Sequence, residues 1–341
     1  SNGKFVKTVV NSPLQDNLPA QGVPVGPRSY GWVPSEGAML TWVEALDGGD
    51  PRKKVSPRDK LMSWNSPFTG EPAEMLKTEQ RFQGRMFGEK DGLMLFFDYN
   101  RDNQRRRMFV TDYRSPSSSR MISDLNVNDR YNDIGQPVTK LLSSGSSVVR
   151  QSGDFIFLQG SGASPDGDRP FLRRIDLKTL QTEEIFRSGI EEYESFVALM
   201  DVSGTNFLTR KESVVEPPNI YIRQVCPPGS ICTAMASRRI TDFKDPAPQL
   251  RGIQKQLVKY KRADGVELSF TLYTPPGYKP GTPLPTLVWA YPLEFTDPAT
   301  AGQVTGSTNR FTQIGGISHL FFLLQGYAVL DNATMPVVGD P

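Results

Sequence analysis

The chain has 341 residues, of which 37% are hydrophobic and 22% are charged, and its formal net charge is +2. This length favours two domains, and the composition is that of a globular protein with a sizeable core. The near-neutral charge argues against steering to nucleic acid or to a membrane surface. No apolar run approaches the roughly 18 residues that a membrane span needs. The 30 glycines and 28 prolines favour short strands with frequent turns.

The first 250 residues alternate short apolar strands with polar turns. The strands are predicted in pairs, each an inner strand followed by an outer hairpin strand: 39–45 with 60–66, 93–99 with 107–113, 155–159 with 171–177, and 196–201 with 219–224. The inner strands recur at roughly 40–60 residues, near the period of four-stranded propeller blades. About four blades can be counted, so we expect a partial β-propeller that lacks blades on its N-terminal side. A β-sandwich is the alternative on pattern alone.

A proline-rich stretch at residues 244–252 predicts a linker, which places a first domain at residues 1–250 and a second at 251–341. Strands at 256–261 and 266–273 flank the Ala-Asp-Gly triplet 263–265, which is a strong hairpin signal. Buried strands are expected at 286–290 and 327–330, with a helix at about 317–324 between them. This order is typical of the N-terminal part of an α/β sheet.

The two cysteines, Cys226 and Cys232, lie close together in the sequence. They would close a small loop in an oxidising compartment, and two free thiols fit the sequence about as well. A metal site has less support, because there is no second Cys/His pair. The pair slightly favours a periplasmic, exported or organellar location over a cytoplasmic one, and no metal or cofactor is expected.

Tyr291 is the residue that points most directly to chemistry. It lies at the carboxyl end of the predicted strand 286–290, and ligand sites of α/β sheets gather at such ends. Its hydroxyl can donate a hydrogen bond to a developing oxyanion, and packing at a strand end is the alternative. His319, the single histidine, lies near the start of the predicted helix, where we expect a surface or partly buried role. No G-x-S-x-G nucleophile turn occurs in the chain.

Ten segments carry a likeness to a known family, and they follow one another along the chain in the order that the family has. They are WVEALDGGDP (42–51), SPFTGEP (66–72), DRYND (129–133), GASPDGDRP (162–170), EPPN (216–219), PQLRG (248–252), YKRADGVEL (260–268), WAYPLEF (289–295), AGQV (301–304) and GYAVL (326–330). Together they resemble the prolyl oligopeptidase family of serine peptidases, and within it the glutamyl endopeptidase-like branch. The resemblance implies a propeller followed by the N-terminal part of an α/β-hydrolase domain, with the propeller admitting peptides but not folded proteins.

The resemblance also assigns roles. Tyr291 matches the family's oxyanion-hole tyrosine, and the reaction would be peptide-bond hydrolysis through an acyl-enzyme. The catalytic Ser, Asp and His have no counterpart here, so we expect this chain to be inactive alone and to need the remainder of its polypeptide. Cleavage after Glu would require a cationic pocket; Arg130, Arg169 and Arg310 are candidates, among which the sequence does not choose. A non-enzymatic propeller that binds peptides or proteins is the alternative function.

Overall fold

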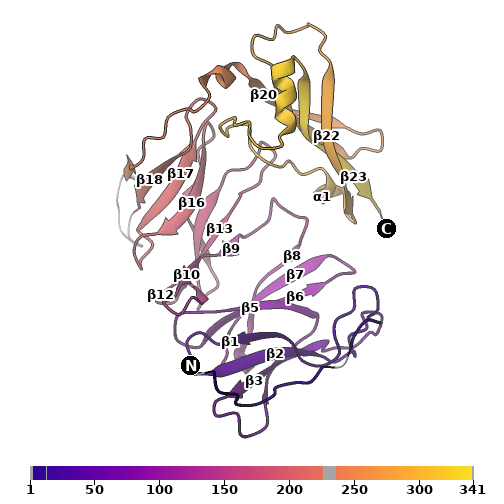
Figure 1. The fold of residues 1–341 in the computed structure, drawn as a ribbon, viewed down its shortest axis with the longest axis vertical. Coiled ribbons are helices and arrows are strands. Elements are labelled where there is room, and N and C mark those ends of the chain that lie inside the picture. The colour runs from indigo at the N-terminus through magenta and orange to yellow at the C-terminus, as the bar shows by residue number, and fades with distance from the viewer. Residues whose placement is uncertain (1–2, 13, 226–235, 340–341) are drawn as a thin grey trace. The chain divides into compact units, whose positions relative to one another are not determined.

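The structure is a computed structural model that describes residues 3–12, 14–225 and 236–339, so Cys226 and Cys232 lie outside the described residues. The chain forms two compact units: residues 1–126 with 138–151, and residues 127–137 with 152–341. Nearly all of the regular structure is β-sheet (Figure 1). Within the described residues, no helix has the length and apolar character to cross a membrane. The predicted boundary after residue 250 falls inside the second unit and stays a prediction.

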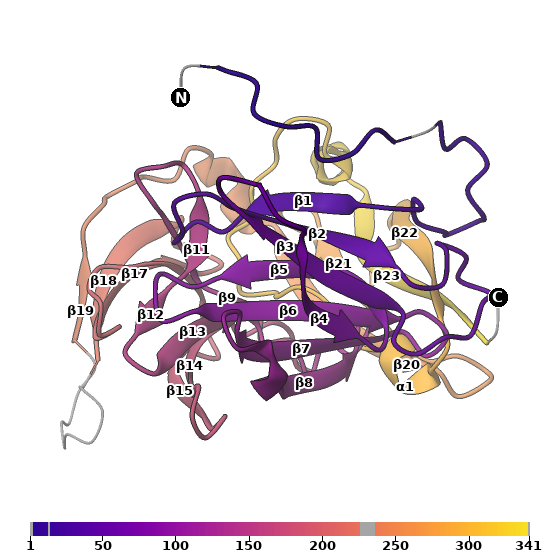
Figure 2. The same cartoon turned by 90° about the horizontal axis from the view of Figure 1, so that it is seen from below.

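The first unit contains two antiparallel four-stranded sheets and a short hairpin (Figure 2). The first sheet has the order β1 (Arg28–Trp32), β2 (Met39–Ala45), β3 (Asp59–Asn65) and β4 (Ala73–Thr78). The second has the order β5 (Arg81–Phe87), β6 (Leu93–Asn100), β7 (Arg105–Asp112) and β8 (Arg120–Asn126). The 3₁₀ helix η1 (Pro116–Ser118) joins β7 to β8, and β10 (Thr139–Leu141) pairs with β11 (Ser147–Val149).

Strands that are apolar on both faces lie in the middle of these sheets. Five consecutive residues of β2 are buried, as are the first four of β6, because both faces of each strand are covered. Val43, Leu61, Met94 and Phe96 join one hydrophobic core. The continuous apolar runs therefore explain why these strands were predicted at nearly their observed positions.

Among the buried carboxylates of the first unit, two are held by the same arginine, Arg81. Asp59 accepts from Arg81 Nη1 at 2.6 Å and from the Phe82 N–H at 2.7 Å, and Arg28 lies 2.8 Å away. Asp47 pairs with Arg81 and also accepts from the Gly49 N–H at 2.9 Å. Burial of a charge is tolerated when it is paired and hydrogen-bonded, as both carboxylates are here.

The second unit begins with two more antiparallel sheets. The third sheet has the order β12 (Gln151–Ser152), β13 (Phe155–Gly160), β14 (Phe171–Asp176) and β15 (Thr182–Arg187), and β9 (Gln136–Pro137) also pairs with β13. The fourth has the order β16 (Tyr193–Leu199), β17 (Asn206–Glu212), β18 (Asn219–Gln224) and β19 (Ala236–Arg239). The predicted pairing of 196–201 with 219–224 is wrong, because β17 lies between β16 and β18. That strand was missed because its second half, TRKE, is polar and charged and ends its apolar run early.

The last sheet, called the C-terminal sheet below, mixes antiparallel and parallel pairs. Its order is β20 (Gln254–Lys261), β21 (Glu267–Thr274), β23 (Ala328–Val338) and β22 (Thr286–Phe295), and β22 runs parallel to β23. The β20–β21 turn uses Gly265 at φ 87°, as the predicted hairpin requires. The 3₁₀ helix η2 (Pro248–Gly252) precedes β20.

The connection from β22 to β23 carries the short helix α1 (Pro298–Ala301) and the 3₁₀ helix η3 (His319–Gln325). The predicted helix is therefore present, as a 3₁₀ helix. Ser318 caps its N-terminus, and Gly326 ends it at φ 82°. Leu323 packs against Val329 of β23, so η3 lies against the C-terminal sheet (Figure 1).

Candidate active site

A cavity of about 380 Å³ lies where β22 and β23 approach their carboxyl ends. Its lining includes Trp289 and Tyr291 from β22, Asn332 from β23, and Arg130 and Gln303 from two loops. Because the two strands are parallel, their carboxyl ends meet at the same edge of the sheet, which is where α/β proteins place their ligands. All of these residues belong to the second unit.

A β-bulge in β23 shapes this cavity. Val288 pairs with Leu330 and Ala290 with Ala333, so Asp331 and Asn332 together oppose the single residue Trp289. Asn332 has φ 52°, a left-handed conformation that asparagine adopts more readily than most residues. Bulges re-aim side chains and are frequent beside active sites, and here Asn332 lines the cavity.

His319 fixes the other residue of the bulge. Its Nε2 lies 2.7 Å from Asp331 Oδ1, and its ring stacks on Trp289 with centroids 4.4 Å apart and planes inclined by 8°. His319 is partly buried, as the sequence predicts. It thus ties η3 to both strands and supports one wall of the cavity.

Tyr291 lines the cavity and has an unpaired hydroxyl within the described residues. The residue is 77% exposed, and among the described residues its hydroxyl has no hydrogen-bond partner. Its backbone pairs with Thr334, whose Oγ1 accepts from the Ser269 N–H at 2.8 Å and donates to the Ser269 carbonyl at 3.1 Å. The strand that carries Tyr291 is therefore braced, while its hydroxyl stays available as a donor.

Arg130 approaches the same cavity from the loop after β8. Gln303 Oε1 accepts from the Arg130 N–H at 2.7 Å, and Gln303 Nε2 donates to Asp129 Oδ1 at 2.9 Å. The Val304 N–H donates to the Tyr131 hydroxyl at 2.9 Å. Two of the segments that carried the family likeness, 129–133 and 301–304, are thus clamped to one another. Sequence reasoning did not single out Gln303, although its presence in that motif was an available signal.

The other two candidate arginines lie elsewhere. Arg169 Nε donates to the Ser188 carbonyl at 3.0 Å. Arg310 stacks over the Tyr193 ring at 4.9 Å, and its Nε lies 3.6 Å from Glu212 Oε1. Within the described chain, neither is among the residues that line the cavity of Tyr291. The structure therefore brings together two of the four predicted site residues, Tyr291 and Arg130.

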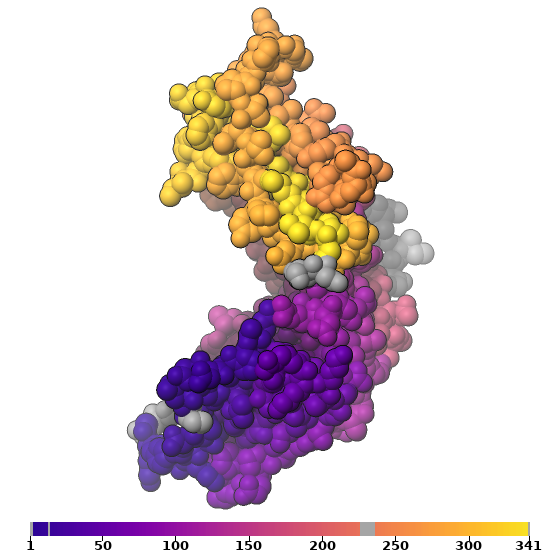
Figure 3. All heavy atoms as spheres, turned by 90° about the vertical axis from the view of Figure 1, so that its right-hand side faces the viewer, coloured from indigo at the N-terminus to yellow at the C-terminus, as the bar shows by residue number. Residues whose placement is uncertain are grey.

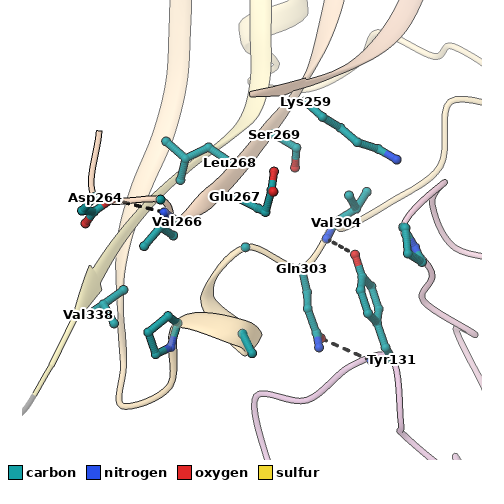
Figure 4. A pocket seen from close by; sticks show the side chains of 15 residues that line it. Tyr131, Lys259, Asp264, Val266, Glu267, Leu268, Ser269, Gln303, Val304 and Val338 are labelled. Atoms are coloured by element: carbon teal, nitrogen blue, oxygen red, sulfur yellow. Dashed lines mark hydrogen bonds between the residues drawn. The ribbon is translucent and has the colours of Figure 1, made fainter. Parts of the chain in front are cut away.

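A second cavity of about 620 Å³ lies beside α1 (Figure 4). Val266 and Leu268 of β21, Val338 of β23 and Tyr131 line it, and Gln303 lines both cavities. Its charged lining residues are already paired: Lys259 lies 3.0 Å from Asp166, and Glu267 lies 2.9 Å from Lys261. It offers an apolar wall and no unpaired charge among the described residues.

Large apolar side chains are exposed along β22 and β23. Trp289 is 54% exposed, and Val288, Leu293, Met335 and Val337 are exposed to a similar degree. Figure 3 shows the C-terminal sheet and its neighbouring segments in orange and yellow. β22 is also an edge strand of the sheet, so one side of its backbone is unpaired in the described chain. Exposed apolar surface of this kind marks an interaction site.

Comparison with known proteins assigns the family. No family model matches the chain. The chain is 36% identical over 99% of its length to a protein named probable glutamyl endopeptidase, chloroplastic, from Oryza sativa subsp. japonica, and 34% identical over its whole length to the protein of the same name from Arabidopsis thaliana. It spans 38% and 37% of these two relatives.

A solved structure shows the same fold. The acylaminoacyl peptidase from Pyrococcus horikoshii matches 93% of this chain with 41% of its own, at a TM-score of 0.50 and 13% identity. At that identity the likeness concerns the fold alone. The full-length sequence likeness carries the assignment: the chain belongs to the prolyl oligopeptidase family, in its glutamyl endopeptidase-like branch.

Proposed function

We propose that this chain is the propeller-bearing part of a serine peptidase, together with the first strands of its α/β-hydrolase domain. The observation that carries the proposal is the cavity at the carboxyl ends of the parallel strands β22 and β23, which is lined by Tyr291, whose hydroxyl has no hydrogen-bond partner among the described residues. The four antiparallel sheets that precede it correspond to propeller blades, which would limit access to peptides.

The chemistry follows from the position of Tyr291. A serine hydroxyl adds to the scissile carbonyl while a histidine takes its proton, and the carbonyl oxygen becomes an oxyanion. A donor aimed at that oxygen stabilises the transition state more than the ground state, because the charge develops only as the bond forms. The Tyr291 hydroxyl is this donor in the proposal. Collapse releases the amine and leaves an acyl-enzyme, which water then hydrolyses.

The nucleophile, the acid and the base come from outside this chain, which contains no G-x-S-x-G turn. Two observations support a remainder of the same polypeptide as their source. The relatives are more than twice as long as this chain, and β22 presents an unpaired edge with exposed apolar side chains. A further parallel strand from that remainder, with its covering helices, would bury these side chains.

Cleavage after Glu and an organellar location are supported by the names of the two plant relatives, both called probable glutamyl endopeptidase, chloroplastic. In these respects the proposal extends what is known of the relatives to this chain.

The test compares the full-length protein with this chain alone. The full-length protein should hydrolyse a fluorogenic glutamyl peptide and should be labelled by a serine-directed fluorophosphonate, whereas the 341-residue chain should do neither. Full-length protein that binds the peptide without cleaving it, and that resists the label, would replace the enzyme with a peptide-binding propeller. Turnover by the 341-residue chain would contradict the proposal that the nucleophile, the acid and the base come from outside this chain.

A further inference from the structure

We propose that Arg130 is the residue that selects the substrate: its guanidinium binds the side-chain carboxylate of the glutamyl residue on the acyl side of the scissile bond. The inference rests on the proposed peptidase function and deepens it, because it chooses one arginine from three that the sequence could not separate. Arg130 and Tyr291 line the same cavity, so a substrate whose carbonyl meets Tyr291 has its side chain in that cavity.

The guanidinium of Arg130 has few hydrogen-bond partners among the described residues. A guanidinium has five N–H donors, yet among the described residues Arg130 has a single side-chain contact, Nη2 to Asp168 Oδ1 at 3.4 Å. Its Nε is buried without a partner. Short charge-assisted bonds between such groups lie near 2.7–2.9 Å, so the contact with Asp168 is a long one.

The pKa of the Asp168 carboxyl agrees with a weak ion pair between Asp168 and Arg130. Burial raises the pKa of the Asp168 carboxyl, although the nearby Arg130 and the Gly306 backbone act to lower it. A close ion pair would hold this pKa below its usual range. The guanidinium thus keeps most of its hydrogen-bonding capacity for a ligand, and a planar carboxylate is the group that its donor geometry fits best.

The backbone of Arg130 is held in place. Gln303 Oε1 accepts from the N–H groups of both Arg130 and Tyr131, at 2.7 and 3.3 Å, and Gln303 Nε2 binds Asp129. Asp129 also accepts from the Asn132 side chain at 2.7 Å. A cation on a braced loop loses little freedom when it binds an anion, and such preorganisation favours specific recognition.

Arg169 and Arg310 differ from Arg130 in the contacts of their side chains and in their position relative to the cavity. The side chain of Arg169 donates to the Ser188 carbonyl inside its own sheet, and Arg310 lies against Glu212 and the Tyr193 ring. Each contributes to local structure, and neither lines the cavity within the described chain. They are therefore suitable controls.

The experiment uses the full-length protein and two peptides that differ only in Glu or Gln on the acyl side of the cleaved bond. Arg130→Gln should lower kcat/KM for the Glu peptide by about 10- to 100-fold, the range expected for loss of a charged hydrogen bond. It should leave kcat/KM for the Gln peptide within about twofold, since uniform loss would mean a structural defect. Arg130→Lys should retain part of the preference, because it keeps the charge but loses the fork geometry.

Arg310→Gln and Arg169→Gln should not change the Glu/Gln ratio. A selective loss in either control, with Arg130→Gln unchanged, would assign the carboxylate to the other arginine. Equal losses for both peptides in Arg130→Gln, with a lowered melting temperature, would make Arg130 structural.

A binding measurement separates this proposal from the peptidase function. Fluorescent peptides ending in Glu or Gln at the acyl position are titrated into the wild-type protein and into Arg130→Gln. A preference for the Glu peptide that Arg130→Gln abolishes supports the proposal even if no peptide is cleaved. Equal affinity for the two peptides in the wild-type protein would overturn it.

Discussion

The first sheet and the C-terminal sheet treat charge and apolar surface in opposite ways. The first sheet buries Asp59 beneath Arg28 and Arg81 and covers the apolar side chains of β2 on both faces. The C-terminal sheet leaves Trp289, Tyr291 and Leu293 exposed along its edge strand β22. A sheet whose charges are paired within its own unit and whose core is closed is stabilised by residues of that unit, whereas an apolar edge gains stability from what covers it. Residues such as Asp59 therefore serve the stability of the fold, whereas the exposed residues of β22 are available for binding and chemistry.

The largest expected effect is on the buried network of the first sheet. Asp59→Ala removes the acceptor of Arg28 and Arg81 and of the Phe82 N–H. Arg81 keeps its pair with Asp47, but Arg28 is left without a carboxylate, and breaking a buried ion pair from one side costs about 3–5 kcal/mol. Urea unfolding followed by tryptophan fluorescence should show this loss, since Trp32, Trp42 and Trp64 lie on β1 to β3.

The matched control is Lys77→Ala on β4, where the Lys77–Glu74 pair is about half exposed at both side chains. Exposed pairs contribute about 0–1 kcal/mol, so the unfolding midpoint should hardly move. Equal effects for the two variants would remove the distinction between buried and surface charge in this sheet.

A partly buried lysine at the start of the C-terminal sheet gives a second, pH-dependent effect. Burial lowers the pKa of the Lys255 ammonium to about 8, and its Nζ donates to the Arg310 carbonyl. Because the folded-state pKa lies below the unfolded value, the folded protein binds fewer protons between about pH 8 and 10.5, and stability rises with pH across that window.

Lys255→Met should abolish that rise and should increase the free energy of unfolding at pH 7 by about 1–3 kcal/mol, since it removes the cost of burying the charge. The gain should shrink as the pH approaches 10.5, the usual pKa of lysine. Chemical unfolding at several pH values measures it, and a gain that does not depend on pH would point to packing instead.

A smaller effect is expected at the wall of the cavity. His319→Ala removes the hydrogen bond to Asp331 and the stack on Trp289, which together contribute about 1–2 kcal/mol. His319→Phe keeps the stack and loses the hydrogen bond, so it should recover about half of the loss. Thermal unfolding of both variants provides the measurement, and identical melting temperatures for them would show that the stack contributes little.

The sequence predicted the apolar interior strands well and the amphipathic or charged strands poorly. β2 has its predicted bounds, because both faces of this interior strand are buried over five consecutive residues. β17 was missed because its second half is TRKE, whose buried Glu212 is the acceptor for the Phe311 N–H. Such burial depends on a partner from a distant part of the chain, and periodicity cannot report it.

The candidate site was predicted in part. Tyr291 was predicted at the end of a strand over 286–290, but β22 continues to Phe295, so Tyr291 lies inside the strand; it nevertheless lines the cavity. The choice of Arg130 over Arg169 and Arg310 needed the structure, since it depends on the clamp between residues 129–132 and Gln303, which are more than 170 positions apart. The bulge at Asp331 and Asn332 likewise had no sequence signal, because it arises from the register of β22 and β23.

The most direct test is the turnover of Tyr291→Phe in the full-length protein, with Tyr260→Phe on β20 as the control because Tyr260 is exposed outside the cavity. Loss of one oxyanion donor lowers kcat by about 10²–10³-fold. The account predicts that loss for Tyr291→Phe with KM nearly unchanged, and normal turnover for Tyr260→Phe. A near-normal kcat for Tyr291→Phe would remove Tyr291 from the site and with it the assignment of this cavity to catalysis.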